Sequence, residues 1–146
     1  LGFIPLPYRG AYVASKYALE GLTDTLRLEL RGSGISVSLI EPGPILSRFR
    51  DNAHRAFRSN IDRESSVHRD AYRRAESRLT KEGPAQPFTL GPEAVCAKLI
   101  HALESPRPRA RYYVTFPTHL LGTLKRLLPT SGLDWFLARV SRGGEG

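Results

Sequence analysis

Apolar residues recur at helical spacing from Ala11 to Leu30, which predicts a helix of about five turns. The apolar positions are Tyr12, Leu19, Leu22, Leu26 and Leu30, and the small residues Ala14, Ala18 and Gly21 lie between them. Gly32 and Gly34 end the predicted helix, because glycine accepts the left-handed backbone that often follows a helix.

Two segments with strand character flank a second predicted helix. Residues 35–41 alternate in part and then become continuously apolar before Pro42-Gly43, which predicts a buried parallel strand. A Pro-Glu pair opens a predicted helix over 91–103, and the aromatic and β-branched run at 111–116 has strand propensity. Together they predict a right-handed βαβ unit with two parallel strands, and therefore an α/β fold.

A long polar insertion at residues 47–90 lies within the crossover between these strands. It is rich in arginine and predicts helices at roughly 47–58 and 65–81, each with one thin apolar face. Such an insertion is typical of a mobile substrate cover. An inert surface elaboration would have the same composition.

The tail at 118–146 carries two leucine-rich runs separated by Pro129 and Gly132, which predict two short amphipathic helices. Binding of these helices to a membrane surface is one alternative. Their short length instead favours packing on the protein body or over a lipophilic substrate pocket.

The composition indicates a globular chain, with 40% hydrophobic and 25% charged residues and no apolar run long enough to span a membrane. A single cysteine cannot form an internal disulfide, which favours a reducing, cytoplasmic location. The net charge of +8 could suggest a nucleic-acid partner. The arginines are scattered among acids without a recognition motif, so we expect a solvated basic surface and no nucleic-acid binding.

Candidate chemistry is concentrated in the first predicted helix, where Tyr12 and Lys16 stand four residues apart and therefore on one face. A neighbouring ammonium favours the phenolate and lowers the pKa of a tyrosine, which is how a tyrosine becomes a general acid or base. Such a pair also occurs by chance on solvated helices. A second candidate is Pro42-Gly43 at the carboxyl end of a strand, where open α/β sheets bind ligands, although a plain strand-ending turn would look the same.

The order of these pieces resembles the short-chain dehydrogenase/reductase family. The matching residues are Tyr12-Val-Ala-Ser-Lys16-Tyr17-Ala-Leu-Glu-Gly21-Leu, then Leu26-Arg-Leu-Glu-Leu30, Gly34-Ile-Ser-Val, and Pro42-Gly43-Pro-Ile45-Leu-Ser47. The resemblance implies the C-terminal half of a Rossmann-like doubly wound parallel sheet at residues 1–117, followed by the helical tail. The family's glycine-rich fingerprint and its catalytic serine are missing from this sequence, so we expect the N-terminal half to be absent and the chain to be a fragment.

The resemblance also implies roles for individual residues. Tyr12 would exchange the hydroxyl proton of an alcohol or carbonyl substrate, and Lys16 would lower the pKa of Tyr12 and bind the nicotinamide ribose of NAD or NADP. The cofactor would also meet Pro42, Gly43, Ile45 and Ser47, where the family usually has threonine in place of Ser47. Substrate contacts are expected at Pro44, Phe49 and Phe57, and the leucine-rich tail favours a lipophilic substrate. The helix of Tyr12 would pair with its counterpart in a homo-oligomer.

Two other functional hypotheses remain open at this stage. Without the glycine-rich turn, this sequence has no binding site for the pyrophosphate of the cofactor. The chain could therefore be an inactive fragment or an interaction module. The hypothesis that the chain is a nucleic-acid-binding module is supported by its net charge alone.

Overall fold

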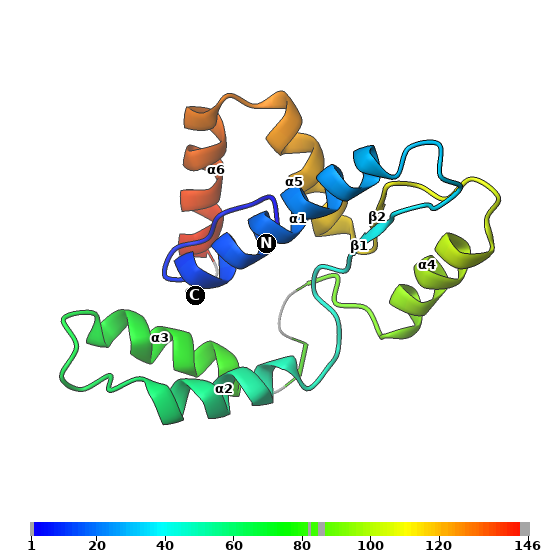
Figure 1. Ribbon diagram of the computed structural model, residues 1–146. Coiled ribbons are helices and arrows are strands. Elements are labelled where there is room, and N and C mark those ends of the chain that lie inside the picture. Colours follow the sequence, from blue (N-terminus) through cyan, green and yellow to red (C-terminus); the bar gives the residue numbers. More distant parts are fainter. Residues whose placement is uncertain (1, 82, 85–86, 144–146) are drawn as a thin grey trace. The chain divides into compact units, whose positions relative to one another are not determined.

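The computed structural model describes residues 2–81, 83–84 and 87–143 (Figure 1). It divides into two compact units. The first, which we call the frame, comprises Leu1–Gly43 and Glu93–Gly146, and the second, the hairpin unit, comprises Pro44–Pro92. The predicted division between residues 1–117 and a tail at 118–146 remains a prediction.

The frame opens with a loop and the helix α1, Gly10–Glu29. The predicted helix is confirmed to within a residue at each end. Gly32 and Gly34 follow it with φ angles of 87° and 81°, in the left-handed region that glycine enters without strain. No residue of α1 is buried, so the helix keeps its leucines on the surface of the frame.

The sheet of the frame has two parallel strands, β1 (Leu39–Glu41) and β2 (Arg111–Tyr113), with the helix α4 (Glu93–Glu104) between them in sequence. Leu39 pairs with Arg111 and Glu41 with Tyr113. This arrangement confirms the predicted α/β fold with two parallel strands.

Both strands are shorter than the predicted segments 35–41 and 111–116. The ladder begins where the Leu39 N–H donates to the Ala110 carbonyl at 2.9 Å. Pro108 lies just upstream and has no N–H with which to continue the ladder. At the other end, Thr115 occupies the N-cap position of the next helix, so the chain leaves the sheet after Tyr113.

The prediction that the first strand is buried was wrong for its apolar residues. Leu39 and Ile40 are only half-buried, whereas Glu41 is the buried residue of β1. Among the described residues β1 pairs with β2 alone, so its other edge has no neighbouring strand to cover it.

Two helices complete the frame, α5 (Phe116–Leu127) and α6 (Thr130–Gly143). They confirm the predicted pair of amphipathic helices, although α5 begins two residues earlier than expected. Their apolar faces meet the N-terminal loop in a small core. This core consists of Ile4, Leu133 and Leu137, with Phe3, Leu121, Leu128 and Phe136 packed around it. Within the described parts of the chain, no helix is both long and apolar enough to cross a membrane.

The hairpin unit contains α2 (Phe49–Asn60) and α3 (Arg69–Thr80), close to the predicted helices, and the two lie side by side in Figure 1. The rings of Phe57 and Tyr72 meet edge to face with centroids 5.8 Å apart. His54 Nε2 lies 3.0 Å from Glu76 Oε1, and this hydrogen bond lowers the pKa of the Glu76 carboxyl. Arg50 Nε of α2 also donates to the Leu79 carbonyl of α3 at 3.4 Å, so aromatic and polar contacts together join the two helices.

Candidate functional site

Tyr12 and Lys16 occupy the first two turns of α1. The Lys16 ammonium lies 5.5 Å from the centroid of the Tyr12 ring, as the four-residue spacing on a helix requires. The Tyr12 side chain is 40% exposed, so its hydroxyl can be reached from solvent. The pair thus combines a phenol that can donate a proton with a cation held beside its ring.

Pro42 and Gly43 follow β1 on the surface of the frame. Gly43 has a φ of 76°, and its Cα faces the N-terminus of α5. A Cβ at this position would overlap the hydroxyl oxygens of Thr115 and Thr118, two buried side chains whose oxygens lie 3.0 Å apart. The turn itself therefore requires glycine at this position, independently of the cofactor contact that the family resemblance implies.

We expect Gly43→Ala to destabilise the protein more than Gly34→Ala does. Both positions have positive φ, but a Cβ at Gly34 would meet no atom within 4 Å, so Gly34→Ala measures backbone strain alone. The overlap at Gly43 should add about 1–3 kcal/mol, as overpacking does. Chemical unfolding of both variants measures this difference, and equal losses of stability would contradict the packing role of Gly43.

The remaining predicted site residues lie in the hairpin unit. Ile45 pairs with Leu90 in an isolated parallel bridge, and the Ser47 hydroxyl accepts a hydrogen bond from the Phe49 N–H at 3.3 Å. Phe49 is 59% exposed, whereas Phe57 packs against Tyr72 inside the helical hairpin. Pro44 is half-buried where the hairpin unit begins. Of the predicted substrate residues, Phe49 has the most exposed aromatic ring.

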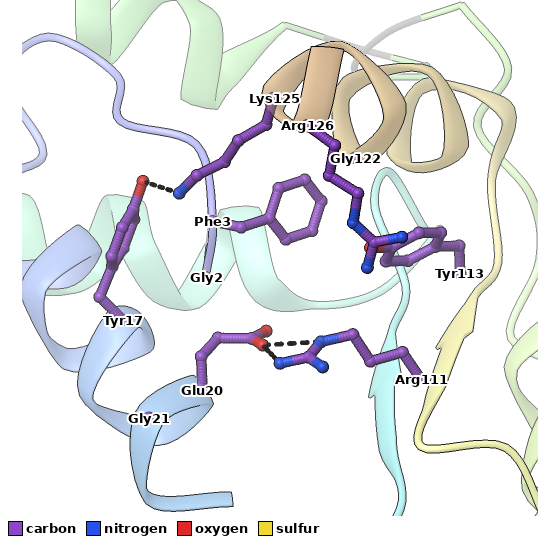
Figure 2. Close-up of a pocket in the computed structure, with 10 residues that line it drawn as sticks. All are labelled: Gly2, Phe3, Tyr17, Glu20, Gly21, Arg111, Tyr113, Gly122, Lys125 and Arg126. Atoms are coloured by element: carbon purple, nitrogen blue, oxygen red, sulfur yellow. Dashed lines mark hydrogen bonds and ion pairs between the residues drawn. The ribbon is translucent and has the colours of Figure 1, made fainter. Parts of the chain in front are cut away.

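An ionic cluster of Glu20, Asp24, Glu41 and Arg111 was missed by sequence analysis. The Arg111 guanidinium donates to Glu20 Oε2 through Nε at 3.2 Å and through Nη2 at 3.0 Å, as Figure 2 shows. Its Nη2 also donates to Asp24 Oδ2 at 2.7 Å, and Nε lies 3.6 Å from Glu41 Oε1. The cluster therefore joins β1, β2 and α1.

The cluster has three carboxyl groups and one guanidinium, which sets its electrostatics. Neither Glu41 oxygen accepts a hydrogen bond from the described residues, and its side chain is only 8% exposed. Burial, together with the nearby negative charge of Glu20, raises the pKa of Glu41 to about 7. The hydrogen bond from Arg111 lowers the pKa of Asp24, and the same contact raises the pKa of Arg111.

The spacing of two members of this cluster, Glu20 and Asp24, is visible in the sequence. Glu20 and Asp24 follow Lys16 at successive four-residue steps, which places all three along one side of the helix. The partner of the two carboxylates lies 91 and 87 residues further along the chain, and no local pattern identifies it.

Above the ion pair lies an open cavity of about 500 Å³, bounded by α1, α5, β2 and the N-terminal loop (Figure 2). Lys125 reaches across one side, where its ammonium donates to the Tyr17 hydroxyl at 3.0 Å. Phe3 and Tyr113 supply its aromatic walls. Over the stretches that the structure describes, no three His, Cys, Asp or Glu side chains gather as a metal site.

Comparison with known proteins shows which family this chain is similar to. Residues 1–57 match the family model described as short chain dehydrogenase. The chain is 47% identical over 137 residues to "Uncharacterized oxidoreductase YbbO" of Escherichia coli strain K12, covering 94% of this chain and 45% of that protein. It is 35% identical over 142 residues to "Probable short-chain type dehydrogenase/reductase VdlC" of Helicobacter pylori strain J99, covering 97% of this chain and 50% of VdlC.

A human protein is also similar. The chain is 34% identical over 116 residues to 17-beta-hydroxysteroid dehydrogenase type 1, covering 78% of this chain and 34% of the human protein. The chain therefore spans about half or less of the length of these relatives. From the family model and the similarity along nearly all of its own residues, the chain belongs to the short-chain dehydrogenase/reductase family.

Proposed function

We propose that this chain carries the proton-transferring part of an oxidoreductase that interconverts an alcohol and a ketone or aldehyde with NAD or NADP. The observation that carries the proposal is the Tyr12–Lys16 pair, with an accessible phenol and an ammonium 5.5 Å from its ring centroid. Family membership supports the class of reaction. A bound nicotinamide cofactor would supply or accept the hydride.

In this proposal Tyr12 is the general acid or base. Its hydroxyl donates a proton to the carbonyl oxygen when a ketone is reduced, and its phenolate form removes the hydroxyl proton when an alcohol is oxidised. A positioned side chain of this kind accelerates proton transfer by about 10²–10⁴-fold. The Lys16 ammonium favours negative charge on the phenol oxygen and has further N–H groups with which to bind a ribose hydroxyl.

The donor groups near Tyr12 fit the nicotinamide half of such a cofactor. A phenol and an ammonium on adjacent turns of α1 can both bond to hydroxyl groups of a ribose. Pro42, Gly43, Ile45 and Ser47 are proposed to meet the nicotinamide carboxamide. The sequence contains no glycine-rich turn for the pyrophosphate, so the other half of the cofactor has no proposed contact in these residues.

The proposed substrate is a small alcohol or carbonyl compound with a lipophilic body. The exposed ring of Phe49 supports this class, and one relative is named for a steroid substrate. We propose Pro44, Phe49 and Phe57 as the substrate side of the site and the hairpin unit as its cover.

We also propose that the active protein is a homo-oligomer paired through α1. This helix has no buried residue, and its leucines at 19, 22 and 26 are 46%, 68% and 46% exposed. Exposed apolar side chains at helical spacing are typical of a surface that another helix covers. Analytical ultracentrifugation of the protein tests this expectation, and a monomer would contradict it.

A second candidate function is that of an inactive interaction module. The edge of β1 that no strand covers among the described residues favours it, because an open edge can pair with another chain. The DNA immediately upstream of the codon for Leu1 distinguishes the two candidates. A strand, a glycine-rich turn and a serine encoded there in the same reading frame would favour the oxidoreductase, and a stop codon would favour the module.

We expect Lys16→Ala to impair both turnover and cofactor binding, because one ammonium serves the phenol and the ribose. Steady-state kinetics of the complete gene product should show a lower kcat, and titration should show weaker binding of NAD(H) or NADP(H). Lys98→Ala, at a half-buried position of α4 outside the proposed site, is the control and should change neither quantity. Unchanged cofactor affinity in Lys16→Ala would contradict the ribose contact.

A further inference from the structure

The helix that carries Tyr12 and Lys16 has little apolar contact with the rest of the frame. None of its residues is buried, and Leu22 and Leu28 are more than half exposed. Apolar burial, which usually fixes a helix against a sheet, therefore contributes little to the position of α1. Polar contacts therefore have to fix the position of α1, since apolar packing does not.

Arg111 provides such contacts from the first residue of β2. Its guanidinium bonds to Glu20 through two nitrogens and to Asp24 one turn later, at distances of 2.7–3.2 Å. The Glu20 side chain is 14% exposed and that of Arg111 is 25% exposed, so water competes weakly for this pair. A rigid planar guanidinium that bridges two successive turns fixes both the rotation and the axial position of the helix.

The Nε of Arg111 that donates to Glu20 also lies near a carboxyl group of the neighbouring strand. Glu41 of β1 lies 3.6 Å from Arg111 Nε and is itself buried. Figure 2 shows the Arg111 side chain extending from β2 toward Glu20 along the floor of the cavity. The guanidinium is therefore held between the sheet and α1 and cannot move freely with the helix.

The anchored residues lie on the same continuous helix as the proposed catalytic pair. Tyr12, Lys16, Glu20 and Asp24 follow one another at four-residue steps along α1. Glu20 is about 12 Å along the axis from Tyr12, at 1.5 Å of rise per residue. A continuous helix transmits a rotation at Glu20 to Lys16 and Tyr12.

We propose that Arg111 is a positioning residue, which holds α1 at the rotation that presents Tyr12 and Lys16 to the substrate and cofactor. This inference rests on the proposed function. Arg111 touches no reacting atom in this assignment and acts through Glu20 and Asp24.

The test compares Arg111→Lys with Arg107→Lys in the complete gene product. Lysine keeps the charge at position 111 but cannot bridge both carboxylates as a guanidinium does. Arg107 is an exposed loop residue and controls for the change of side-chain type. The measurements are kcat, the KM for NAD(P)H, the melting temperature, and the NMR resonances of ¹³C-labelled tyrosine rings, with the Tyr12 signal assigned from Tyr12→Phe.

We expect Arg111→Lys to remain folded, to lose about tenfold to a hundredfold in kcat, as misplacement of catalytic groups does, and to shift the Tyr12 ring resonance. The shift is expected because the Lys16 ammonium next to that ring would move with the helix. Adding Glu20→Gln to Arg111→Lys should cost little more, since both changes remove the same contact. Arg107→Lys should leave kcat and the resonance unchanged.

A folded Arg111→Lys protein with unchanged kcat or an unmoved Tyr12 resonance would overturn the inference. If Arg111→Lys does not fold, Glu20→Gln decides the question by the same two measurements. Failure of the proposed function has a different signature. If Tyr12→Phe keeps its turnover, the catalytic assignment is wrong, while the resonance shift still shows whether Arg111 positions α1.

Discussion

Tyr12→Phe should lower kcat of the complete gene product by about 10²–10⁴-fold while leaving cofactor affinity nearly intact. The substitution removes only the hydroxyl, which is the group proposed to exchange the proton, and keeps the ring beside the Lys16 ammonium at the start of α1. Stopped-flow or steady-state kinetics give the turnover, and fluorescence titration with NAD(P)H gives the affinity.

Tyr17→Phe is the matched control for this prediction. Tyr17 is also on α1 and is 37% exposed, but its hydroxyl bonds to Lys125. Loss of the Tyr17 hydroxyl should leave turnover little changed. The Lys125 ammonium also lies 4.4 Å from the centroid of the Tyr17 ring, so the contact between ammonium and ring can remain. If Tyr12→Phe retained more than a few per cent of the wild-type activity, Tyr12 could not be the acid or base.

Stability should fall between pH 4.5 and pH 7 because of Glu41, and Glu41→Gln should remove this loss. Burial and the charge of Glu20 raise the pKa of Glu41 from 4.5 to about 7 in the folded protein. Over this range the unfolded chain releases the Glu41 proton while the folded protein retains it, so rising pH favours unfolding. The difference in pKa corresponds to about 3 kcal/mol of unfolding free energy, fully present below pH 4.5 and lost by about pH 7.

Thermal unfolding of wild type and Glu41→Gln at pH 5 and pH 8 measures this effect. The nearby charged groups, among them Glu20, Arg111 and Arg126, are the same in both proteins, so the difference between the proteins isolates Glu41. Glu29→Gln, at the exposed end of α1, serves as the control and should keep the wild-type pH dependence. Parallel pH profiles for wild type and Glu41→Gln would contradict the prediction.

The helices were predictable because their causes are local. The apolar spacing of α1 and the glycines at 32 and 34 lie next to each other in the sequence, and each acts within a few residues. The same holds for α4, α5 and α6. The α/β class followed from the order of strand, helix and strand, because a parallel pair needs a crossover.

The ends of the strands and the ionic cluster depend on distant residues. The ladder stops at Tyr113 because Thr115 turns into α5. The apolar residues of β1 are left half-buried because, among the described residues, β2 alone pairs with this strand. A sequence pattern shows Glu41 as part of a strand, but its raised pKa depends on its burial in the fold and on the charge of Glu20, which is distant in the sequence. The Tyr12–Lys16 pair could be proposed from spacing alone because both residues lie on one helix.

The first and last segments of the hairpin unit are hydrogen-bonded to each other. The Leu46 N–H donates to the Leu90 carbonyl at 2.9 Å, and the Leu90 N–H donates to the Pro44 carbonyl at 3.2 Å. Because these hydrogen bonds hold the two ends of the segment together, the residues between them can change in number at little cost in stability. The free energy of closing a loop changes slowly with its length. Descendants of this sequence can therefore lengthen, shorten or replace α2 and α3 without re-pairing β1 and β2.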